Sequence, residues 1–482
     1  MINLRPILFV LGLLISILAL AMLLPTLVGL SQGRDGLVFL GSAGLVLFTG
    51  VLMVLITRGK IEGLEQREAF LITVAAWAIL PVFAALPFRF TENQFTYTDA
   101  LFEAMSGLTT TGSTMIADLE VQSRAILLWR SILQWLGGVG IVLMALSVLP
   151  LLKVGGMQLF RIEFAGRGDQ AMPRAIQLVA MIFLVYILMT TSCMVLYWLA
   201  GMSAFDALNH AMTTVATGGF ATRNESIGFY ASPIIESIAI LFMLLGSLPF
   251  LLYIQAIRGG GATVIGRDEQ VRGLLMLVLS AIAVLTWYLI AVHDQPFWLA
   301  LRRTTFNVTS ILTGTGYATA NYDLWGVFAI IVFLFVMFIG GCAGSTTCGI
   351  KIFRIQVLLS VAGAQIRHLL QPHAVVINLY AGKPLPAGVG ESVMGFFFLF
   401  ILTFAASSCL LGLAGLDFIT AVSGAATAIA NVGPGLGPII GPNGNFSSLN
   451  DPAKWILVLT MLLGRLELFT VFVLFSRRFW VR

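Results

Sequence analysis

Long apolar runs separated by short polar connections dominate this chain. A membrane-spanning helix needs roughly 20 consecutive apolar residues, and the first run, 7–30, reaches that length without a charged residue. It is longer than the apolar core of a signal peptide, about 7–15 residues, so we expect it to be retained. The pattern predicts ten spans, an even number that puts both termini on one side. They lie near 7–30, 37–57, 68–88, 125–152, 174–200, 231–257, 270–293, 324–372 (interrupted), 390–414 and 453–479.

Four further segments are too apolar for ordinary loops and too short to cross the membrane twice: 98–116, 204–222, 299–318 and 417–438. Each begins with helix-compatible residues and then turns to Thr, Gly, Ser, Ala and Asn. Non-helical backbone at membrane depth is tolerated only where it is buried in protein or lines water. The pattern therefore predicts four re-entrant pore loops, each a half-helix followed by an extended strand.

These segments repeat one another. Residues 99–105 and 206–212 agree at five of seven positions, and each begins with an aspartate thirteen residues before a glycine, Gly112 or Gly219. Gly316 and Gly433 take the corresponding places in the third and fourth segments, and the spans that follow the four loops each carry a glycine: Gly137, Gly246, Gly340 and Gly464. Self-similarity of this kind indicates a repeat architecture. We expect an all-α integral membrane protein with four repeats, 61–160, 161–262, 263–375 and 376–482, around one pore, preceded by two extra helices within 1–60.

Composition and charge agree with a membrane protein. Hydrophobic residues make up 59% of the chain and charged residues 10%, against about 25% charged in a soluble domain. Most basic residues fall in alternate connections, within 58–67, 153–174, 258–272, 351–383 and 477–482. The positive-inside rule then puts both termini in the cytoplasm. No basic stripe is interleaved with aromatic residues, which argues against nucleic-acid binding.

Enzyme and metal signatures are weak. The four cysteines, Cys193, Cys342, Cys348 and Cys409, have no disulfide or zinc spacing, so we interpret them as small residues of helices. The stretch 29–33 matches G-x-S-x-G but follows a membrane span rather than a strand, so it lacks the context of a catalytic serine. We predict that the chain is not an enzyme.

The four loops carry the candidate chemistry. A dehydrated cation needs oxygen ligands, which backbone carbonyls can supply without trapping the ion, and glycine reaches the backbone angles that turn successive carbonyls toward one axis. Half-helices aimed at that axis by their C-terminal ends favour a cation. The strands contain no carboxylate, so a monovalent cation fits better than calcium. The candidate filter residues are Thr110, Thr111, Gly112, Thr217, Gly218, Gly219, Thr315, Gly316, Asn431, Val432 and Gly433. The alternative, small residues at close helix contacts, suits one loop better than four at matching positions.

Two features accompany the loops. The eighth span contains a run that a straight lipid-facing helix would not favour, with Gly340, Gly341, Gly344, Ser345, Thr346, Thr347 and Gly349. It is either a tight helix crossing or a flexible loop beneath the filter. The second feature is Arg465, inside the last span. Intramembrane charges usually face the interior and mark an ion path; the alternative is a buried pair with a carboxylate, for which Glu467 is the nearby candidate.

The loop motifs resemble a known family. The Thr-Thr-Thr-Gly stretch ending at Gly112, the Thr-Gly-Thr-Gly-Tyr stretch 313–317, the Asn-Val-Gly-Pro-Gly-Leu-Gly stretch 431–437 and the glycine-rich run 340–351 are similar to the TrkH/TrkG branch of the Trk/Ktr/HKT potassium transporters. The resemblance covers essentially the whole chain, including the two additional N-terminal spans.

The resemblance implies a function and partners. One filter glycine per repeat corresponds to Gly112, Gly219, Gly316 and Gly433. Glycine rather than serine at the first position favours potassium over sodium. The resemblance further implies potassium as the bound ion, an intramembrane gate at 340–349, Arg465 facing the pore below the filter, a homodimer in the inner membrane, and a cytoplasmic nucleotide-binding regulator of the TrkA type. The alternatives are a secondary transporter for sodium or ammonium and a membrane scaffold or enzyme that transports nothing.

Overall fold

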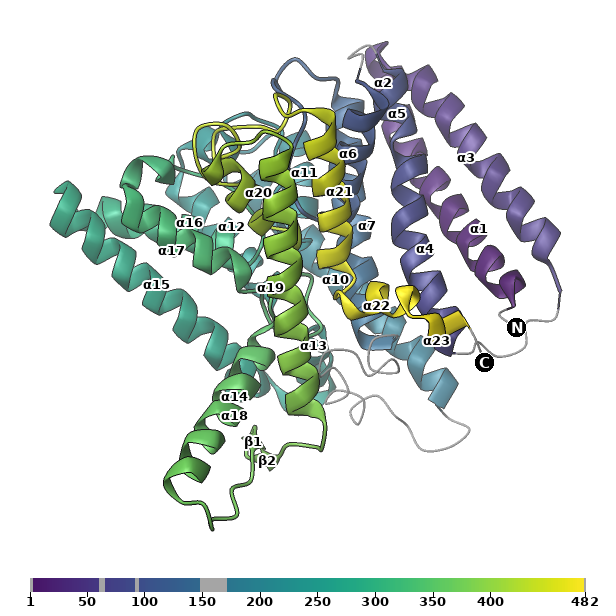
Figure 1. Ribbon diagram of the computed structural model, residues 1–482. Coiled ribbons are helices and arrows are strands. Elements are labelled where there is room, and N and C mark those ends of the chain that lie inside the picture. The colour runs from purple at the N-terminus through teal and green to yellow at the C-terminus, as the bar shows by residue number, and fades with distance from the viewer. Residues whose placement is uncertain (1–2, 60–65, 92–94, 148–170, 481–482) are drawn as a thin grey trace.

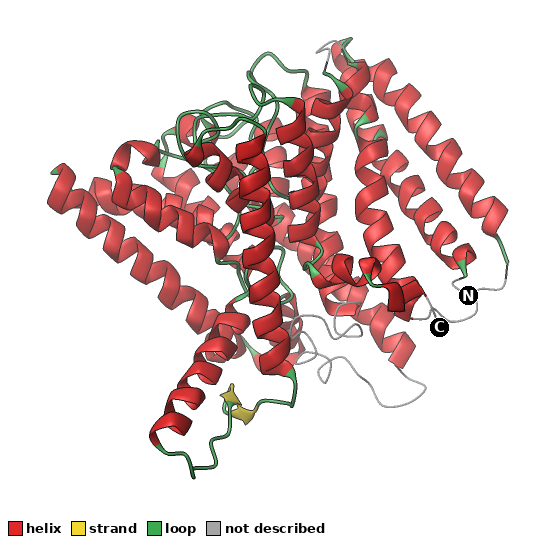
Figure 2. Ribbon diagram, viewed as in Figure 1, coloured by secondary structure: helices red, strands yellow, loops and turns green. Residues whose placement is uncertain are grey.

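The protein is a bundle of helices. The computed structural model describes residues 3–59, 66–91, 95–147 and 171–480, and in these parts the only sheet is a short hairpin of β1 (Leu379–Tyr380) and β2 (Lys383–Pro384). Figure 2 shows helices joined by loops and this one hairpin. The predicted all-α membrane class is confirmed. The end of the predicted span 125–152 and the basic residues Lys60, Lys153, Arg161, Arg167 and Arg482 lie outside the described residues.

Most of the predicted spans correspond to one long helix or to consecutive shorter helices. Apart from the half-helices, the α-helices are α1 (Leu4–Ala21), α2 (Leu23–Gln32), α3 (Gly36–Thr57), α4 (Gln66–Ala84), α5 (Leu86–Phe90), α7 (Arg124–Ser147), α10 (Ala171–Leu199), α12 (Pro233–Ser247), α13 (Phe250–Gln255), α14 (Thr263–Arg267), α15 (Glu269–His293), α17 (Val327–Phe338), α18 (Ile352–Leu370), α19 (Val389–Leu413), α21 (Asp451–Arg465), α22 (Phe469–Phe472) and α23 (Arg477–Trp480). Helix α14 lies between two predicted spans. In the described parts of the chain, seven helices are long and apolar enough to cross a membrane, or nine if two bent pairs each count as one span. The predicted count of ten would also require the divided span of α17 and α18 to cross the membrane, and it stays a prediction.

The spans 231–257 and 453–479 differ from the prediction because each is broken. Helices α12 and α13 meet at 92°, where Pro249 cannot donate a backbone hydrogen bond to continue the helix. The last span turns by 101° after α21, where Glu467 and Leu468 both have positive φ. The interrupted span stops at Phe338 and resumes at Ile352. Among the second spans, as far as the described residues show them, only α7 is a single unbroken helix.

Four buried half-helices lie at the centre of the bundle: α6 (Tyr97–Leu108), α11 (Ala204–Val215), α16 (Phe297–Leu312) and α20 (Phe418–Ala430). Each packs against the span that follows it and against the corresponding span of the preceding unit. Thus α6 contacts α7 and α21, α11 contacts α12 and α7, α16 contacts α17 and α12, and α20 contacts α21 and α17. These contacts return to their starting point, so the half-helices and four spans form a closed ring.

The N-terminal helices lie outside this ring. Helix α1 packs against α3 and α4, and α2 packs against α3 and α7. Figure 1 shows this group at one edge of the bundle, with the start of α1 and the C-terminal α23 at the same end. That arrangement agrees with the expectation that both termini lie on one side; which side is cytoplasmic remains a prediction.

Candidate functional site: a ring of four glycine loops

Each half-helix passes into its loop through the same hydrogen bond. The amide of the residue before the loop glycine donates to a carbonyl five residues earlier in the half-helix, at 2.9–3.0 Å. The four bonds run from Thr111 to Ser106, Gly218 to Thr213, Thr315 to Ser310 and Val432 to Thr427. The turn reverses the chain at the C-terminal end of each half-helix. The negative end of the helix dipole therefore lies beside the loop in all four units.

The four loops close on one another through their glycines. A Cβ atom on each glycine would lie within 1.8–2.8 Å of a carbonyl oxygen of the next loop, far closer than a side chain tolerates. Gly112 faces the Gly218 carbonyl, Gly219 that of Thr315, Gly316 that of Val432, and Gly433 that of Thr111. The fourth contact returns to the first loop. Only a residue without a side chain lets the four strands approach one axis this closely.

The backbone of the loops is strained at matching positions. All four glycines have positive φ, from 75° to 113°, and so do the residues two positions earlier: Thr110, Thr217, Gly314 and Asn431, at 50° to 68°. The intervening residues do not, so left-handed and ordinary conformations alternate. For a β-branched residue such as threonine a positive φ is an outlier. Strain of this kind costs roughly 1–3 kcal/mol per residue and gathers at functional sites.

A small cavity opens on one side of the ring. It has a volume of about 80 Å³, and its lining includes all four loop glycines, Gly112, Gly219, Gly316 and Gly433. Ser113 also lines it and donates a hydrogen bond of 2.7 Å to the Gly433 carbonyl, joining the first loop to the fourth. The carboxylates of the described residues form no cluster of metal ligands here. A cation at this ring would meet backbone and hydroxyl oxygens, the ligand set suited to a monovalent ion.

Polar side chains of α7 brace the second loop from outside. The Gln134 amide donates to the Gly218 carbonyl at 2.6 Å and accepts from the Phe220 amide at 3.0 Å. Arg130 is buried, pairs with Glu103 of α6 at 2.6 Å and donates to the Ala221 carbonyl at 3.0 Å. These contacts tie the first unit to the second and hold the second loop in place. The sequence analysis missed these residues, although a charged pair and a glutamine inside apolar runs were the available signals.

The interrupted span forms a buried loop beside the ring, next to the C-terminal end of α11. The Gly340 amide donates to the Ile350 carbonyl and the Ile350 amide to the Phe338 carbonyl, at 2.9 and 2.8 Å, so the loop leaves and returns at one point. Between these ends the chain bonds to neighbouring units. The Thr346 hydroxyl lies 3.0 Å from that of Thr217 in the second loop and donates to the Gly246 carbonyl at 2.9 Å.

All seven residues predicted for the loop lie in this excursion: Gly340, Gly341, Gly344, Ser345, Thr346, Thr347 and Gly349. Two glycines allow a close approach. A Cβ on Gly340 would meet the Cys348 carbonyl at 1.8 Å, and one on Gly341 would meet the Thr347 hydroxyl at 2.6 Å. Of the two alternatives for this run, the structure agrees with the loop, because residues 340–350 contain no helix and no tight helix crossing. Lys351, the last residue of the glycine-rich run 340–351, is buried and bonds to Ser345 and Thr347 of the loop.

Arg465 connects the ring to this loop. Its side chain is 1% exposed, at the end of α21. One guanidinium nitrogen donates to the Thr110 hydroxyl at 2.8 Å and lies 3.4 Å from the Thr346 carbonyl and 2.6 Å from the Cys348 sulfur. The other donates to the Gly137 carbonyl at 2.7 Å. Within the described residues these partners are all neutral, so the arginine keeps an unneutralised charge beside the ring.

Glu467 is not the partner of Arg465. It pairs instead with Arg354 of α18, whose guanidinium also lies 3.8 Å from the centre of the Phe396 ring of α19. The bend after α21 turns Glu467 toward α18, which a straight span would not do. Arg354 is fully buried and belongs to this ion pair.

In the first, second and fourth units, the glycine of the second span lets that span approach the half-helix of the same unit. A Cβ on Gly137, Gly246 or Gly464 would lie 1.9–2.9 Å from the carbonyl of Leu108, Val215 or Ile429, near the half-helix end. Gly340 of the third unit meets the buried loop instead. The matching glycines therefore allow the same close helix contact in three units. The third unit differs because its second span is interrupted.

Comparison with known proteins identifies the family. Residues 37–480 match the TrkH family, described as a cation transport protein. The chain belongs to the TrkH family. It is 44% identical to the Trk system potassium uptake protein TrkI of Halomonas elongata, over 98% of this chain and 96% of that protein. It is 38% identical to the Trk system potassium uptake protein TrkH of Salmonella typhimurium, over 99% of both.

A solved structure agrees. The crystal structure of the potassium transporter TrkH from Vibrio parahaemolyticus superposes with a TM-score of 0.91 at 34% identity, covering 99% of this chain and all of that one. The resemblance drawn from the loop motifs is thereby confirmed. Membership of a family of cation transport proteins also agrees with the expectation of a transporter and not an enzyme.

Proposed function

We propose that this protein takes up potassium ions through the ring of four loops. The observation that carries the proposal is the closed set of contacts in which each loop glycine faces a carbonyl of the next loop. A pore of this kind replaces the hydration shell of an ion with backbone oxygens. Relatives that match nearly the whole chain are named potassium uptake proteins. The family resemblance associates glycine rather than serine at the first filter position with potassium, and this chain has Gly112.

The filter in this proposal comprises the eleven predicted residues Thr110, Thr111, Gly112, Thr217, Gly218, Gly219, Thr315, Gly316, Asn431, Val432 and Gly433. The buried loop 340–349 and Arg465 act as the gate. Two contacts support this role: the loop reaches Thr217 at the inner end of the second strand, and Arg465 reaches both Thr110 and Thr346. Movement of the loop would therefore change the ring and the position of the charge together.

The wider setting follows from the family resemblance. We propose that the protein lies in the inner membrane with both termini in the cytoplasm, forms a homodimer, and is regulated by a cytoplasmic nucleotide-binding protein of the TrkA type. Potassium is the transported ion and is held only in passing at the filter. The four units proposed from the sequence, 61–160, 161–262, 263–375 and 376–482, each contain one half-helix and one filter loop.

Ion flux into liposomes tests the proposal directly. The purified protein, reconstituted into liposomes, should take up rubidium as a potassium substitute. Unlabelled potassium should compete for this uptake, while sodium and ammonium should compete poorly. A sodium or ammonium transporter would give a different order of competitors. A membrane scaffold would give no flux above protein-free liposomes.

Shortening the buried loop tests the gate. Deleting 344–349 should raise the basal rubidium flux, because the deletion removes the segment that lies against Thr217 and Arg465. The backbone hydrogen bonds that join Gly340 and Phe338 to Ile350 close the base of the loop. They lie outside the deleted residues, so the two ends of the shortened loop should still meet. Flux and thermal stability should be measured together. A folded deletion variant with unchanged or lower flux would contradict the gate assignment.

A further inference from the structure

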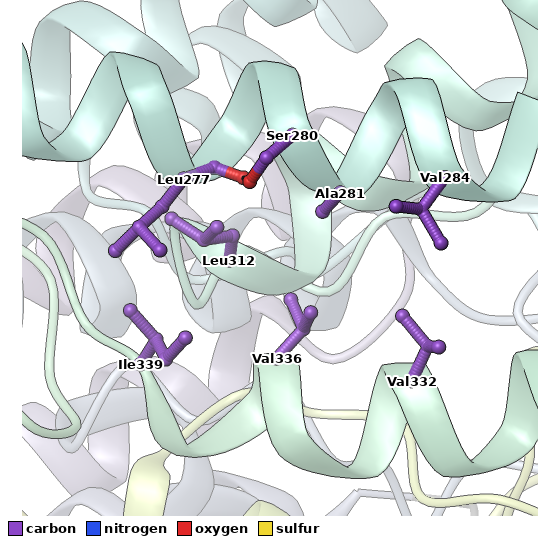
Figure 3. A pocket seen from close by; sticks show the side chains of 8 residues that line it. All are labelled: Leu277, Ser280, Ala281, Val284, Leu312, Val332, Val336 and Ile339. Atoms are coloured by element: carbon purple, nitrogen blue, oxygen red, sulfur yellow. The ribbon is translucent and has the colours of Figure 1, made fainter.

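An apolar pocket lies between α15 and α17, away from the ring cavity. It has a volume of about 180 Å³ and is partly open on its outer side. Figure 3 shows side chains of α15 and α17 facing each other across the pocket, with the last residue of α16 between them. The lining residues are Leu277, Ser280, Ala281, Val284, Leu312, Val332, Val336 and Ile339.

The chemistry of the pocket excludes water as a stable occupant. Ser280 is the only polar side chain in the lining, and its hydroxyl already donates to the Leu277 carbonyl of its own helix at 2.9 Å. A buried water needs two to four polar partners. An apolar occupant would gain free energy by filling the space, because each wall atom would recover dispersion contacts.

The depth of the pocket in the membrane favours a hydrocarbon chain as its occupant. The α15 lining lies within 277–284, the middle of a helix of 25 residues, so the opening is at the depth where the bilayer holds only hydrocarbon. Large apolar side chains around it, such as Leu279 and Phe335, are 63% and 65% exposed and face the same medium. The space of about 180 Å³ is also too narrow for a helix of a second copy, which is about 10–12 Å across with its side chains. A second copy of the chain therefore fits the pocket less well than a narrow acyl chain does.

We propose that this pocket binds the end of a phospholipid acyl chain. A chain seated there would touch Leu312, which is fully buried at the end of the half-helix α16, four residues before Gly316. It would also touch Ile339, where α17 ends and the buried loop begins. The occupant thus supports the half-helix and the hinge of the loop from the lipid side. An effect on transport rests on the proposed function, whereas binding itself does not.

Photolabelling tests the binding. The full-length protein is reconstituted with phosphatidylglycerol whose acyl chain carries a diazirine near its terminal methyl group, irradiated, digested and analysed by mass spectrometry. Label should concentrate on 277–284 and 332–339. The variants Ala281→Trp and Val332→Phe, on opposite walls, fill the pocket and should reduce this label strongly, because each displaced methylene weakens occupancy about fourfold. Leu279→Trp, on the exposed face of α15, is the matched control and should leave the label unchanged.

The outcomes separate binding from transport. Label spread evenly along the exposed face of α15, or equal label in wild type and both filled variants, would overturn the proposal. Label that appears on the pocket only when the protein is diluted to monomers would assign the pocket to a second copy instead. Rubidium flux through Ala281→Trp, measured on the same liposomes, reports the coupling. If the wild-type protein is labelled at the pocket but its rubidium uptake shows no preference for potassium, the proposed function is overturned and the lipid site remains.

Discussion

Replacing Gly219 with alanine should sharply reduce the preference for potassium over sodium. A Cβ at this position would lie 1.8 Å from the Thr315 carbonyl oxygen, and the residue has φ of 75°, which alanine adopts only with strain. The carbonyl must move by more than 1 Å to reach ordinary contact, so the ion loses that ligand. Because each 1.4 kcal/mol of lost binding is a factor of ten, we expect the preference to fall roughly tenfold or more.

The four glycines give this prediction a graded form. The corresponding distances are 2.1 Å at Gly316, 2.3 Å at Gly112 and 2.8 Å at Gly433. Alanine should therefore lower the preference for potassium over sodium most at Gly219 and least at Gly433. Serine at Gly112 should let sodium compete better. Sodium inhibition of rubidium uptake measures the preference in each variant.

A matched glycine on the lipid side controls for general damage. Gly44 lies within α3, with nothing within 4 Å of its added Cβ, so Gly44→Ala should leave both flux and selectivity unchanged. Thermal stability should be recorded for every variant. Stable Gly219→Ala protein with the wild-type order of competitors would contradict the assignment of this ring as the filter.

Much of this site could be predicted from the sequence because the required residues are local. A half-helix of apolar and hydroxyl residues followed by a glycine sits within one segment, and the segment recurs four times. The positions of Gly112, Gly219, Gly316 and Gly433 along the chain therefore indicated the ring before their contacts were known. Gly314 and Asn431 lie two residues before Gly316 and Gly433, and both residue types favour left-handed backbone. In two of the four loops, the sequence therefore also indicates the second position with positive φ.

What the sequence could not predict depends on where spans bend. A continuous apolar run does not reveal that α21 ends at Arg465, and the bend decides that Glu467 meets Arg354 and leaves Arg465 among neutral partners. Spacing along a straight helix gave no basis for pairing Glu467 with α18. Likewise, Gln134 braces the second loop from the first unit, a contact between segments 84 residues apart. Contacts between units follow from the closed ring of helices, which no local pattern describes.

Removing the charge of Arg465 should raise potassium flux. A fixed positive charge near the ion path repels the permeating cation, and at 4 Å this amounts to about 4 kcal/mol at an effective dielectric constant of about 20. Arg465 lies against Thr110 of the first loop, and its described partners are a hydroxyl, two carbonyls, a thiol and the ring of Trp77, all neutral. If about 1.4 kcal/mol of this repulsion contributes to the energy barrier for permeation, Arg465→Ala should increase rubidium flux roughly tenfold. Selectivity should change little, because the four glycines keep their contacts.

Two substitutions separate charge from volume. Arg465→Met keeps most of the side-chain bulk without the charge and should also raise the flux, whereas Arg465→Lys keeps the charge and should not. If both alanine and methionine leave the flux unchanged, the charge does not limit permeation. If methionine behaves like the wild type and only alanine raises the flux, side-chain bulk and not charge closes the path.

Arg354 supplies the matched control, because it is equally buried but has a carboxylate partner. Truncating one member of a buried ion pair strands the other charge and destabilises a protein by about 3–5 kcal/mol. Arg354→Ala should therefore lower the thermal stability markedly, since Glu467 would remain buried without its cation. Arg465→Ala strands no carboxylate and should keep near-normal stability while its flux rises. The opposite pattern, lost stability at Arg465 with no gain in flux, would make Arg465 a structural clamp between the first loop and the buried loop, and the barrier to potassium would then have to reside in the loop backbone itself.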